Sequence, residues 1–400
     1  MSSLTNFKSI LLRYHVLGSL GSCTTRFFRK RKLALAGLIL TSMVILVFVS
    51  HDIQLSLMEH ISLKTFIVRM ILQSQNLDGN SSMYGSFFNS SWATMQSIDI
   101  LNTLDAVSSI NATAVMQFLT GPDQIGPADM PMKYEPQYNI ESAFVITHTA
   151  SALGRLNELP STLIEEIRET IIARQNSTSM EIDIWDMNRM FLLETARLLN
   201  QKQYVNLTLQ KEHVLKTIAE RIWYGNLFGV YFYIKALEEI CLMESGFSYI
   251  RYQMPDVTRS MVEFYILSLW DDTRYGFYED LTYSNPKYYE TSLTATYMAI
   301  YSYIDLSGEP RHSERDALGD KVGFGYEKLL AFLTKCQNRY GLFFDQPWQV
   351  DDRVTSLQIW ATYSAVMLLN KIGRMDFLDQ TVRWPSQPTF IESLNDQFRK

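Results

Sequence analysis

The feature that most constrains this chain is an internal helical repeat. After residue 51, apolar residues recur mainly at the 3.6-residue spacing of an amphipathic helix. The run Trp92-Ala93-Thr94-Met95 returns as Trp360-Ala361-Thr362-Tyr363, and the run at 291–299 resembles the segment at 355–365. A recurring period of this kind is typical of proteins built by stacking one supersecondary unit. We therefore expect paired helices rather than a single irregular domain.

The paired helices predict a closed ring. A helical hairpin buries little apolar surface alone, so several hairpins hide their apolar faces best around a shared centre. The fold class expected is all-α, an α/α toroid of about six hairpins spanning residues 51–380, followed by a polar tail at 381–400. The hairpins are expected to begin near Phe66, Thr113, Leu163, Glu212, Ser260 and Gly325.

Residues 33–50 carry no charge, and as a helix they would reach about 27 Å, close to the thickness of a bilayer core. They predict a transmembrane signal anchor. Residues 1–32 contain seven Lys and Arg and no acid, which places this tail in the cytosol by the positive-inside rule. The remainder is then expected in the secretory-pathway lumen or outside the cell. Two alternatives are a buried core helix and a mitochondrial presequence before an inner-membrane anchor.

Glycosylation motifs agree with an extracytoplasmic domain. Each of the five Asn-x-Ser/Thr sequons lies beyond the anchor. The predicted acceptors are Asn80, Asn89, Asn111, Asn176 and Asn206. In an oxidising compartment Cys241 and Cys336 are candidates for pairing, which the sequence alone leaves open.

Composition excludes several classes. With 47% hydrophobic and 20% charged residues, the chain buries a large core and is not disordered. The net charge of -6, together with the basic tail, leaves the body strongly acidic and a poor partner for nucleic acids. Three cysteines without zinc-finger spacing and no glycine-rich phosphate loop predict no bound metal and no cofactor.

The repeats resemble the prenyltransferase and squalene-cyclase superfamily. Its unit ends one helix in Gln-x-x-x-Gly-x-Phe and begins the next with a Thr-Tyr-x-Ala-like run. Gln337 to Phe343, with Thr362, Tyr363 and Ala365, is the best copy, and segments at 71–79 and 275–299 look like two others. The resemblance covers roughly residues 60–380. It implies a six-hairpin barrel whose central cavity holds isoprenoids or other bulky apolar ligands.

The catalytic residues of that superfamily mostly do not carry over. Members that transfer prenyl groups hold zinc with an Asp-x-Cys pair, but neither cysteine beyond the anchor has an Asp two residues before it. Members that cyclise isoprenoids use an Asp-x-Asp-Asp acid, and the nearest run here, Gln349-Val350-Asp351-Asp352, lacks the first Asp. Asp351 and Asp352 are therefore either a catalytic pair or caps of the last inner helix.

Acids beside aromatic residues are expected at the starts of inner helices, where they would meet at one mouth of the ring. Acids flanked by indoles also suit carbohydrate chemistry. The candidate catalytic acids are Asp271 and Asp272, besides Asp351 and Asp352. The candidate binding residues are Trp185, Trp270, Tyr289, Trp348 and Trp360. The alternative is that these acids are helix caps and the aromatics form a rim.

His148 lies in an apolar run and is expected to point from an inner helix toward the cavity, as a catalytic base or as a hydrogen-bonded core residue. The sequence therefore predicts a membrane-anchored toroid that binds a lipid, an isoprenoid or a protein segment, without zinc-dependent prenyl transfer. The alternatives are a glycan-processing hydrolase, lyase or epimerase, and a cyclase-like isomerase that uses Asp351.

Overall fold

The computed structural model describes residues 58–77, 87, 90–121, 136–175, 187–248, 250–279, 290–307, 326–351 and 357–385. The chain divides into two compact units, and the one that contains the helices and the cavity discussed below is His60–Arg383. The predicted tail at 1–32 and anchor at 33–50 lie outside the described residues. Within the described ranges, no helix is both long and apolar enough to span a bilayer.

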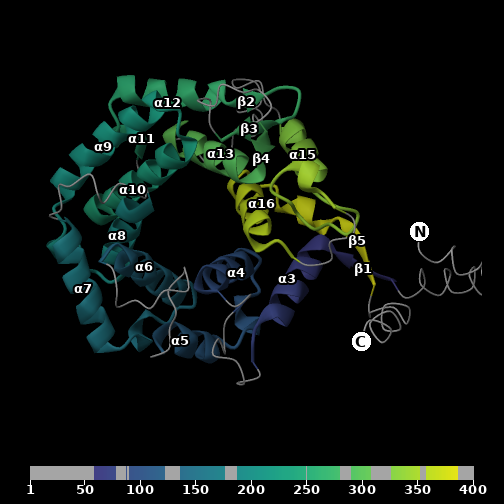
Figure 1. Ribbon diagram of the computed structural model, residues 1–400, viewed down its shortest axis with the longest axis horizontal. Helices are drawn as coiled ribbons and strands as arrows, with labels where there is room; N and C mark the ends of the chain where they lie inside the picture. Colours follow the sequence, from purple (N-terminus) through teal and green to yellow (C-terminus); the bar gives the residue numbers. More distant parts are fainter. Residues whose placement is uncertain are drawn as a thin grey trace, which may run out of the picture. The chain divides into compact units, whose positions relative to one another are not determined.

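The all-α expectation is confirmed for the unit His60–Arg383. In its described part, six inner helices surround a common centre (Figure 1). Each contacts the next along the chain, and the last contacts the first. They are α4 (Ser91–Thr103), α6 (Pro136–Ala152), α8 (Met187–Leu198), α10 (Leu227–Ser245), α13 (Leu293–Ser307) and α16 (Ile359–Lys371).

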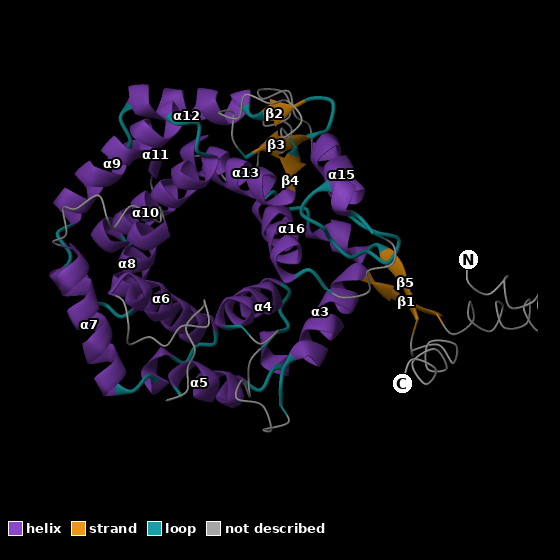
Figure 2. Cartoon of the chain, viewed as in Figure 1, coloured by secondary structure: helices purple, strands orange, loops and turns teal. Residues whose placement is uncertain are grey.

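A second set of helices lies outside the first, one before each inner helix in the chain (Figure 2). Every predicted hairpin start falls within one of these outer helices or one residue before it, which confirms the predicted order of helical pairs. The outer helices are α3 (Leu63–Ser74), α5 (Ala112–Thr120), α7 (Ser161–Gln175), α9 (Leu207–Trp223), α12 (Asp256–Ser268) and α15 (Tyr326–Lys335). A short helix, α11 (Ile250–Gln253), joins α10 to α12.

Local sequence explains where several helices begin. The side chain of Ser90 caps α4, and the Asn226 side chain accepts from Gly229 N at 2.8 Å to cap α10. Asn111 and Asn206 cap the outer helices α5 and α9 in the same way, each accepting from the backbone N–H three residues later at 3.1 Å. Gly246 ends α10 at φ 76°, a left-handed conformation that glycine adopts without a Cβ penalty.

The repeated threonines perform the same task in two repeats. Thr94 Oγ1 accepts from the backbone N–H of Phe87 at 2.9 Å, and Thr296 Oγ1 accepts from that of Phe277 at 3.1 Å. Each hydroxyl also donates to the carbonyl four residues earlier, at 2.7 Å. The threonine thus fastens an inner helix to the segment before it, which explains why the residue recurs in the sequence.

Two small sheets were not predicted. Strand β1 (Met58–Ser62) pairs with β5 (Thr381–Pro385), so a strand occupies the start of the predicted polar tail. In the second sheet, β3 (Gly276–Tyr278) lies antiparallel to both β2 (Trp270–Asp271) and β4 (Thr291–Ser292). The second sheet connects α12 to α13, and none of its residues lines the cavity described below.

Candidate functional site

A cavity of about 580 Å³ occupies the centre of the inner helices. All six of them contribute side chains to its wall, at the three- and four-residue spacing of one helical face. On α4, for example, the lining residues are Trp92, Met95, Gln96 and Asp99. The inner helices therefore share one interior surface. A series of hairpins that did not contact one another would have no such surface.

One mouth of the cavity lies at the N-terminal ends of the inner helices. Phe228 and Trp360, the second residues of α10 and α16, line the cavity and are 37% and 41% exposed. Trp360 is held in place because its indole N–H donates to Thr294 Oγ1 at 2.7 Å. Solvent therefore reaches the cavity past an aromatic rim.

Below this mouth the wall is mainly aromatic and methionine-rich. Phe144 and Phe191 stack with ring centroids 4.3 Å apart, and Trp92 lies 5.7 Å from Phe191. On the opposite side the phenol groups of Tyr231 and Tyr297 share a hydrogen bond of 3.0 Å. Such a surface removes an apolar ligand from water while offering a few fixed polar atoms.

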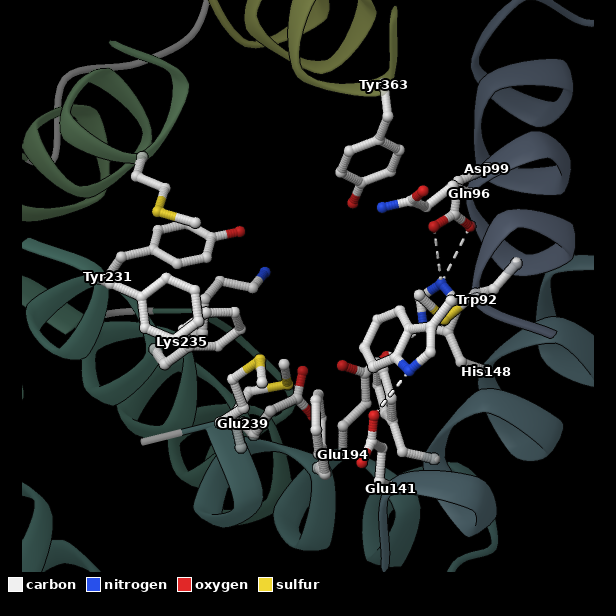
Figure 3. A pocket seen from close by; sticks show the side chains of 18 of the residues that line it. Trp92, Gln96, Asp99, Glu141, His148, Glu194, Tyr231, Lys235, Glu239 and Tyr363 are labelled. Carbon is white, nitrogen blue, oxygen red and sulfur yellow. Dashed lines mark hydrogen bonds and ion pairs between the residues drawn. The ribbon is translucent and has the colours of Figure 1, made fainter. Parts of the chain in front are cut away.

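Charged side chains lie deeper in the cavity. Asp99 follows Trp92 by seven residues on α4, and at a rise of 1.5 Å per residue this places the charged group about 10 Å from the rim. We call this group the charged belt. Its members come from four consecutive inner helices (Figure 3). They are Asp99, His148, Glu194, Arg197, Lys235, Glu238 and Glu239.

His148 lies between two carboxylates of the charged belt. Its Nε2 is 2.9 Å from Asp99 Oδ1, and its Nδ1 is 2.7 Å from Glu194 Oε1 (Figure 3). Ionised carboxylates accept but do not donate, so both ring nitrogens carry protons. Burial by itself lowers the pKa of His148, but Asp99 and Glu194 outweigh it and raise that pKa well above its usual value. The imidazolium in turn lowers the pKa of Glu194 against the opposing effect of burial.

Arg197 and Glu239 extend the charged belt from α8 to α10. The Arg197 guanidinium donates to both carboxylate oxygens, with Nη2 3.3 Å from Glu239 Oε1. Glu239 is only 3% exposed. Its burial, reinforced by the nearby charge of Glu194, raises its pKa to about 7, although Arg197 acts in the opposite direction. Glu239 therefore exchanges a proton near neutral pH.

Lys235 joins α10 to α13. Its ammonium donates to Glu238 Oε2 at 2.9 Å and to the Tyr301 hydroxyl at 2.7 Å, while Tyr301 also donates to Glu238. Burial opposes the ionisation of Glu238, but Lys235 outweighs it and lowers the pKa of Glu238 to about 2. Beneath them Lys371 of α16 pairs with Asp305 of α13. Within the described ranges, no group of three or more histidine, cysteine and acidic side chains is arranged to hold a metal ion.

Two polar residues between the rim and the charged belt complete the wall. Glu141 Oε1 accepts from the Trp92 indole at 2.6 Å, and burial raises the pKa of Glu141 against the effect of that bond. Gln96, on α4 between Trp92 and Asp99, is 4% exposed and points into the cavity (Figure 3). Among the described residues, its amide has no hydrogen-bond partner.

The structure brings two of the predicted site residues to the cavity. His148 points into it, as expected, and Trp360 forms part of its rim. Several others line no part of it, namely Trp270, Asp271, Asp272, Trp348 and Asp351. Three more lie outside the described residues, namely Trp185, Tyr289 and Asp352.

The local roles expected for the acids need correction. Helix α16 begins at Ile359 with Gln358 at its N-cap, so Asp351, eight residues earlier, is not its cap. Trp270, Asp271 and Asp272 follow the end of the outer helix α12 rather than beginning an inner helix. Asp271 Oδ1 accepts from the backbone of Thr273 and Arg274 and stabilises the turn between β2 and β3.

The remaining predicted sites lie away from the cavity. Asn111 and Asn206 are exposed caps of outer helices, where glycosylation stays a prediction. Cys241 and Cys336 are buried and form no disulfide with each other. The other acceptors, Asn80, Asn89 and Asn176, lie outside the described residues.

Apart from His148, the residues of the charged belt were not predicted from the sequence, although a signal for them exists. Lys235 and Glu238 interrupt the long apolar run at 227–243. Charged residues are rarely buried without a partner, so their presence in such a helix indicates a polar site. Gln96 and Asp99 follow Trp92 by four and seven residues, which is the spacing of one helical face. Only the closed arrangement of six helices shows that these faces meet. No family model matches this chain, and no curated protein matches it significantly.

Proposed function

We propose that this chain is a membrane-anchored α/α toroid that binds an apolar small molecule, a lipid or an isoprenoid, in its central cavity. The observation that carries the proposal is the cavity of about 580 Å³, with aromatic and methionine walls contributed by all six inner helices. Its size falls within the range of about 300–1,000 Å³ usual for small-molecule sites. The anchor at 33–50 would hold this domain beside the membrane that supplies such ligands.

The arrangement of the wall supports an oriented ligand. The rim and middle of the cavity are aromatic, whereas the charged belt lies at one end of it. An amphiphile would place its apolar body against Phe144, Phe191 and Phe232 and its polar group against the charged belt. Burial of apolar surface contributes about 25 cal/mol per Å², so filling such a wall favours binding strongly.

The other predicted functions have less support. A glycan-processing enzyme was expected to use the rim carboxylates, which include Asp271, Asp272, Asp351 and Asp352, and a cyclase-like isomerase was expected to use Asp351. Of these acids, the three that the structure describes, Asp271, Asp272 and Asp351, line no part of the cavity. The proposal does not include zinc-dependent prenyl transfer, because the sequence has no Asp-x-Cys pair to carry it.

Two measurements on the full-length chain test the proposal. The first is mass spectrometry of an organic extract of the natively purified protein, in which we expect a stoichiometric apolar compound. The second is calorimetry with octanol as an apolar probe. Met187→Trp, at the half-buried start of α8 on the cavity wall, should weaken octanol binding at least tenfold by filling the entrance.

Met261→Trp is the matched control, because Met261 is 45% exposed on the outer helix α12 and lines no part of the cavity. It should leave octanol binding unchanged. A folded protein that yields no apolar compound and binds no octanol would contradict the proposal. Equal losses in both variants would show that octanol binds elsewhere.

A further inference from the structure

One polar side chain of the cavity, that of Gln96, makes no hydrogen bond to any residue that the structure describes. Gln96 is 4% exposed, and Figure 3 shows its amide directed into the cavity. Its amide faces the space of the cavity, so it is placed to bond a molecule that occupies that space. Gln96 offers one acceptor and two donors, whichever way its amide is turned.

The surrounding atoms are mostly acceptors. Glu194 uses Oε1 for His148, and Glu141 uses Oε1 for Trp92, while the second oxygen of each has no bond partner among the described residues. The lining residues include five acidic side chains, of which four belong to the charged belt and one, Glu239, exchanges a proton near neutral pH, against three cations. The cations are all engaged, since His148, Arg197 and Lys235 each bond at least one carboxylate. A ligand group that fits this corner donates hydrogen bonds and is positively charged.

The aromatic residues around this corner favour the same charge. Trp92, Phe144 and Phe191 lie together, with centroid distances of 4.3 to 6.1 Å, and join the corner formed by α4, α6 and α8. Aromatic faces attract cations, and tryptophan does so most strongly. An anion would meet both this negative face potential and the carboxylates.

We propose that the ligand of the cavity is an apolar molecule with a protonated amine, and that the amine lies in the corner formed by α4, α6 and α8, whose lining residues include Gln96, Glu141 and Glu194. This inference rests on the proposed function and adds the chemical class of the polar group. The amine would donate to the Gln96 carbonyl oxygen and to the unpaired carboxylate oxygens, while the hydrocarbon part extends along the aromatic wall toward the rim.

The test compares three probes with the same chain length, octylamine, octanol and octanoate, by calorimetry on the full-length protein at pH 7. We expect octylamine to bind at least tenfold more tightly than octanol, and octanoate to bind most weakly. Glu141→Gln keeps an acceptor for the Trp92 indole but removes the charge. It should weaken octylamine about tenfold and leave octanol within twofold.

Gln96→Met is the second variant and should weaken octylamine at least threefold without the loss of a charge. Glu220→Gln, on the exposed face of the outer helix α9, is the control and should change neither affinity. Equal binding of octylamine and octanol would overturn this inference and leave the proposed apolar site intact, as would preferred binding of octanoate. Failure of all three probes to bind would contradict the proposed function itself.

Discussion

Asp99 of α4 and Glu194 of α8 bond opposite nitrogens of one imidazole, that of His148 on α6. Three consecutive inner helices are thereby joined through a single protonated ring. Arg197 with Glu239 continues the connection to α10, and Lys235 with Tyr301 continues it to α13. Because the centre of the inner helices is a cavity, their side chains cannot pack against one another there. These bonds therefore hold the inner helices together where side-chain packing is interrupted.

Replacing His148 by glutamine should strongly destabilise the protein. The change leaves the Asp99 and Glu194 carboxylates without the imidazolium between them, and breaking a buried ion pair in this way costs about 3–5 kcal/mol. Urea unfolding at pH 6 is the measurement. The folded-state pKa of His148 is raised, so its contribution is fully present below the unfolded value near 6.5 and is lost as pH rises through the folded value.

His213→Gln, on the outer helix α9, is the matched control and should cost less than His148→Gln, since Nε2 of His213 bonds the Thr217 hydroxyl whereas His148 bonds a carboxylate through each ring nitrogen. Adding Asp99→Asn and Glu194→Gln to the His148→Gln variant should restore much of the lost stability. A cost for His148→Gln no larger than that of the control would contradict the structure of the charged belt.

The free energy of unfolding should depend on pH through Glu239. Its pKa of about 7 in the folded protein exceeds the usual value of 4.5, so the folded state binds a proton that the unfolded state has released between these values. Stability from this residue is therefore present below pH 4.5 and lost as pH rises toward 7. The side chain of the Glu239→Gln variant cannot ionise. As pH rises through this window, the free energy of unfolding of the variant should therefore increase relative to that of the parent by up to about 1.4 kcal/mol for each pH unit.

Chemical unfolding of both proteins between pH 4.5 and 8 provides the measurement. Glu220→Gln, at an exposed position of α9, is the control for a change of the same chemistry. If the difference in the free energy of unfolding between Glu239→Gln and its parent stays constant across the window, Glu239 is ionised throughout. That result would mean that Arg197, rather than burial, determines the pKa of Glu239.

The sequence predicts the helical class and the order of the helical pairs well and the site poorly, for a physical reason. Helical pairs can be recognised from the local spacing of apolar residues. Repeated residues such as Thr94 and Thr296 make the same local hydrogen bonds in different repeats. The cavity depends instead on side chains from six separated helices, so Asp99 and Glu194 come together only when the inner helices close. Asp271 and Asp272 resembled a catalytic pair because adjacent acids beside tryptophan are conspicuous, but the same residues stabilise a turn.

Gly341 should not tolerate a side chain. Its φ of 85° is unfavourable for other residues, and an added Cβ would lie 2.8 Å from Val382 Cγ1 and 2.9 Å from Leu63 Cδ1. We expect Gly341→Ala to lower the free energy of unfolding by about 2–4 kcal/mol, from backbone strain and overpacking together. Gly154→Ala separates the two causes, because Gly154 has φ 68° but no atom within 4 Å of the added Cβ.

Gly154→Ala should therefore cost only about 1 kcal/mol, the backbone contribution alone. Urea unfolding of the two variants beside the parent gives both values. If the two substitutions cost the same, the close approach of Leu63 and Val382 to Gly341 would be wrong, and with it the packing of α3 against the turn that follows α15.

The three equivalent threonines of the repeat should differ in their response to valine. Thr94→Val and Thr296→Val each remove the acceptor of a buried backbone N–H, that of Phe87 or Phe277, and should cost about 1–3 kcal/mol. Thr362 occupies the same repeat position, but its hydroxyl is buried without a partner among the described residues. Thr362→Val removes an unsatisfied polar atom and should be neutral or stabilising by up to about 1 kcal/mol. Equal costs for the three variants, measured by urea unfolding, would mean that the third repeat bonds its threonine as the other two do.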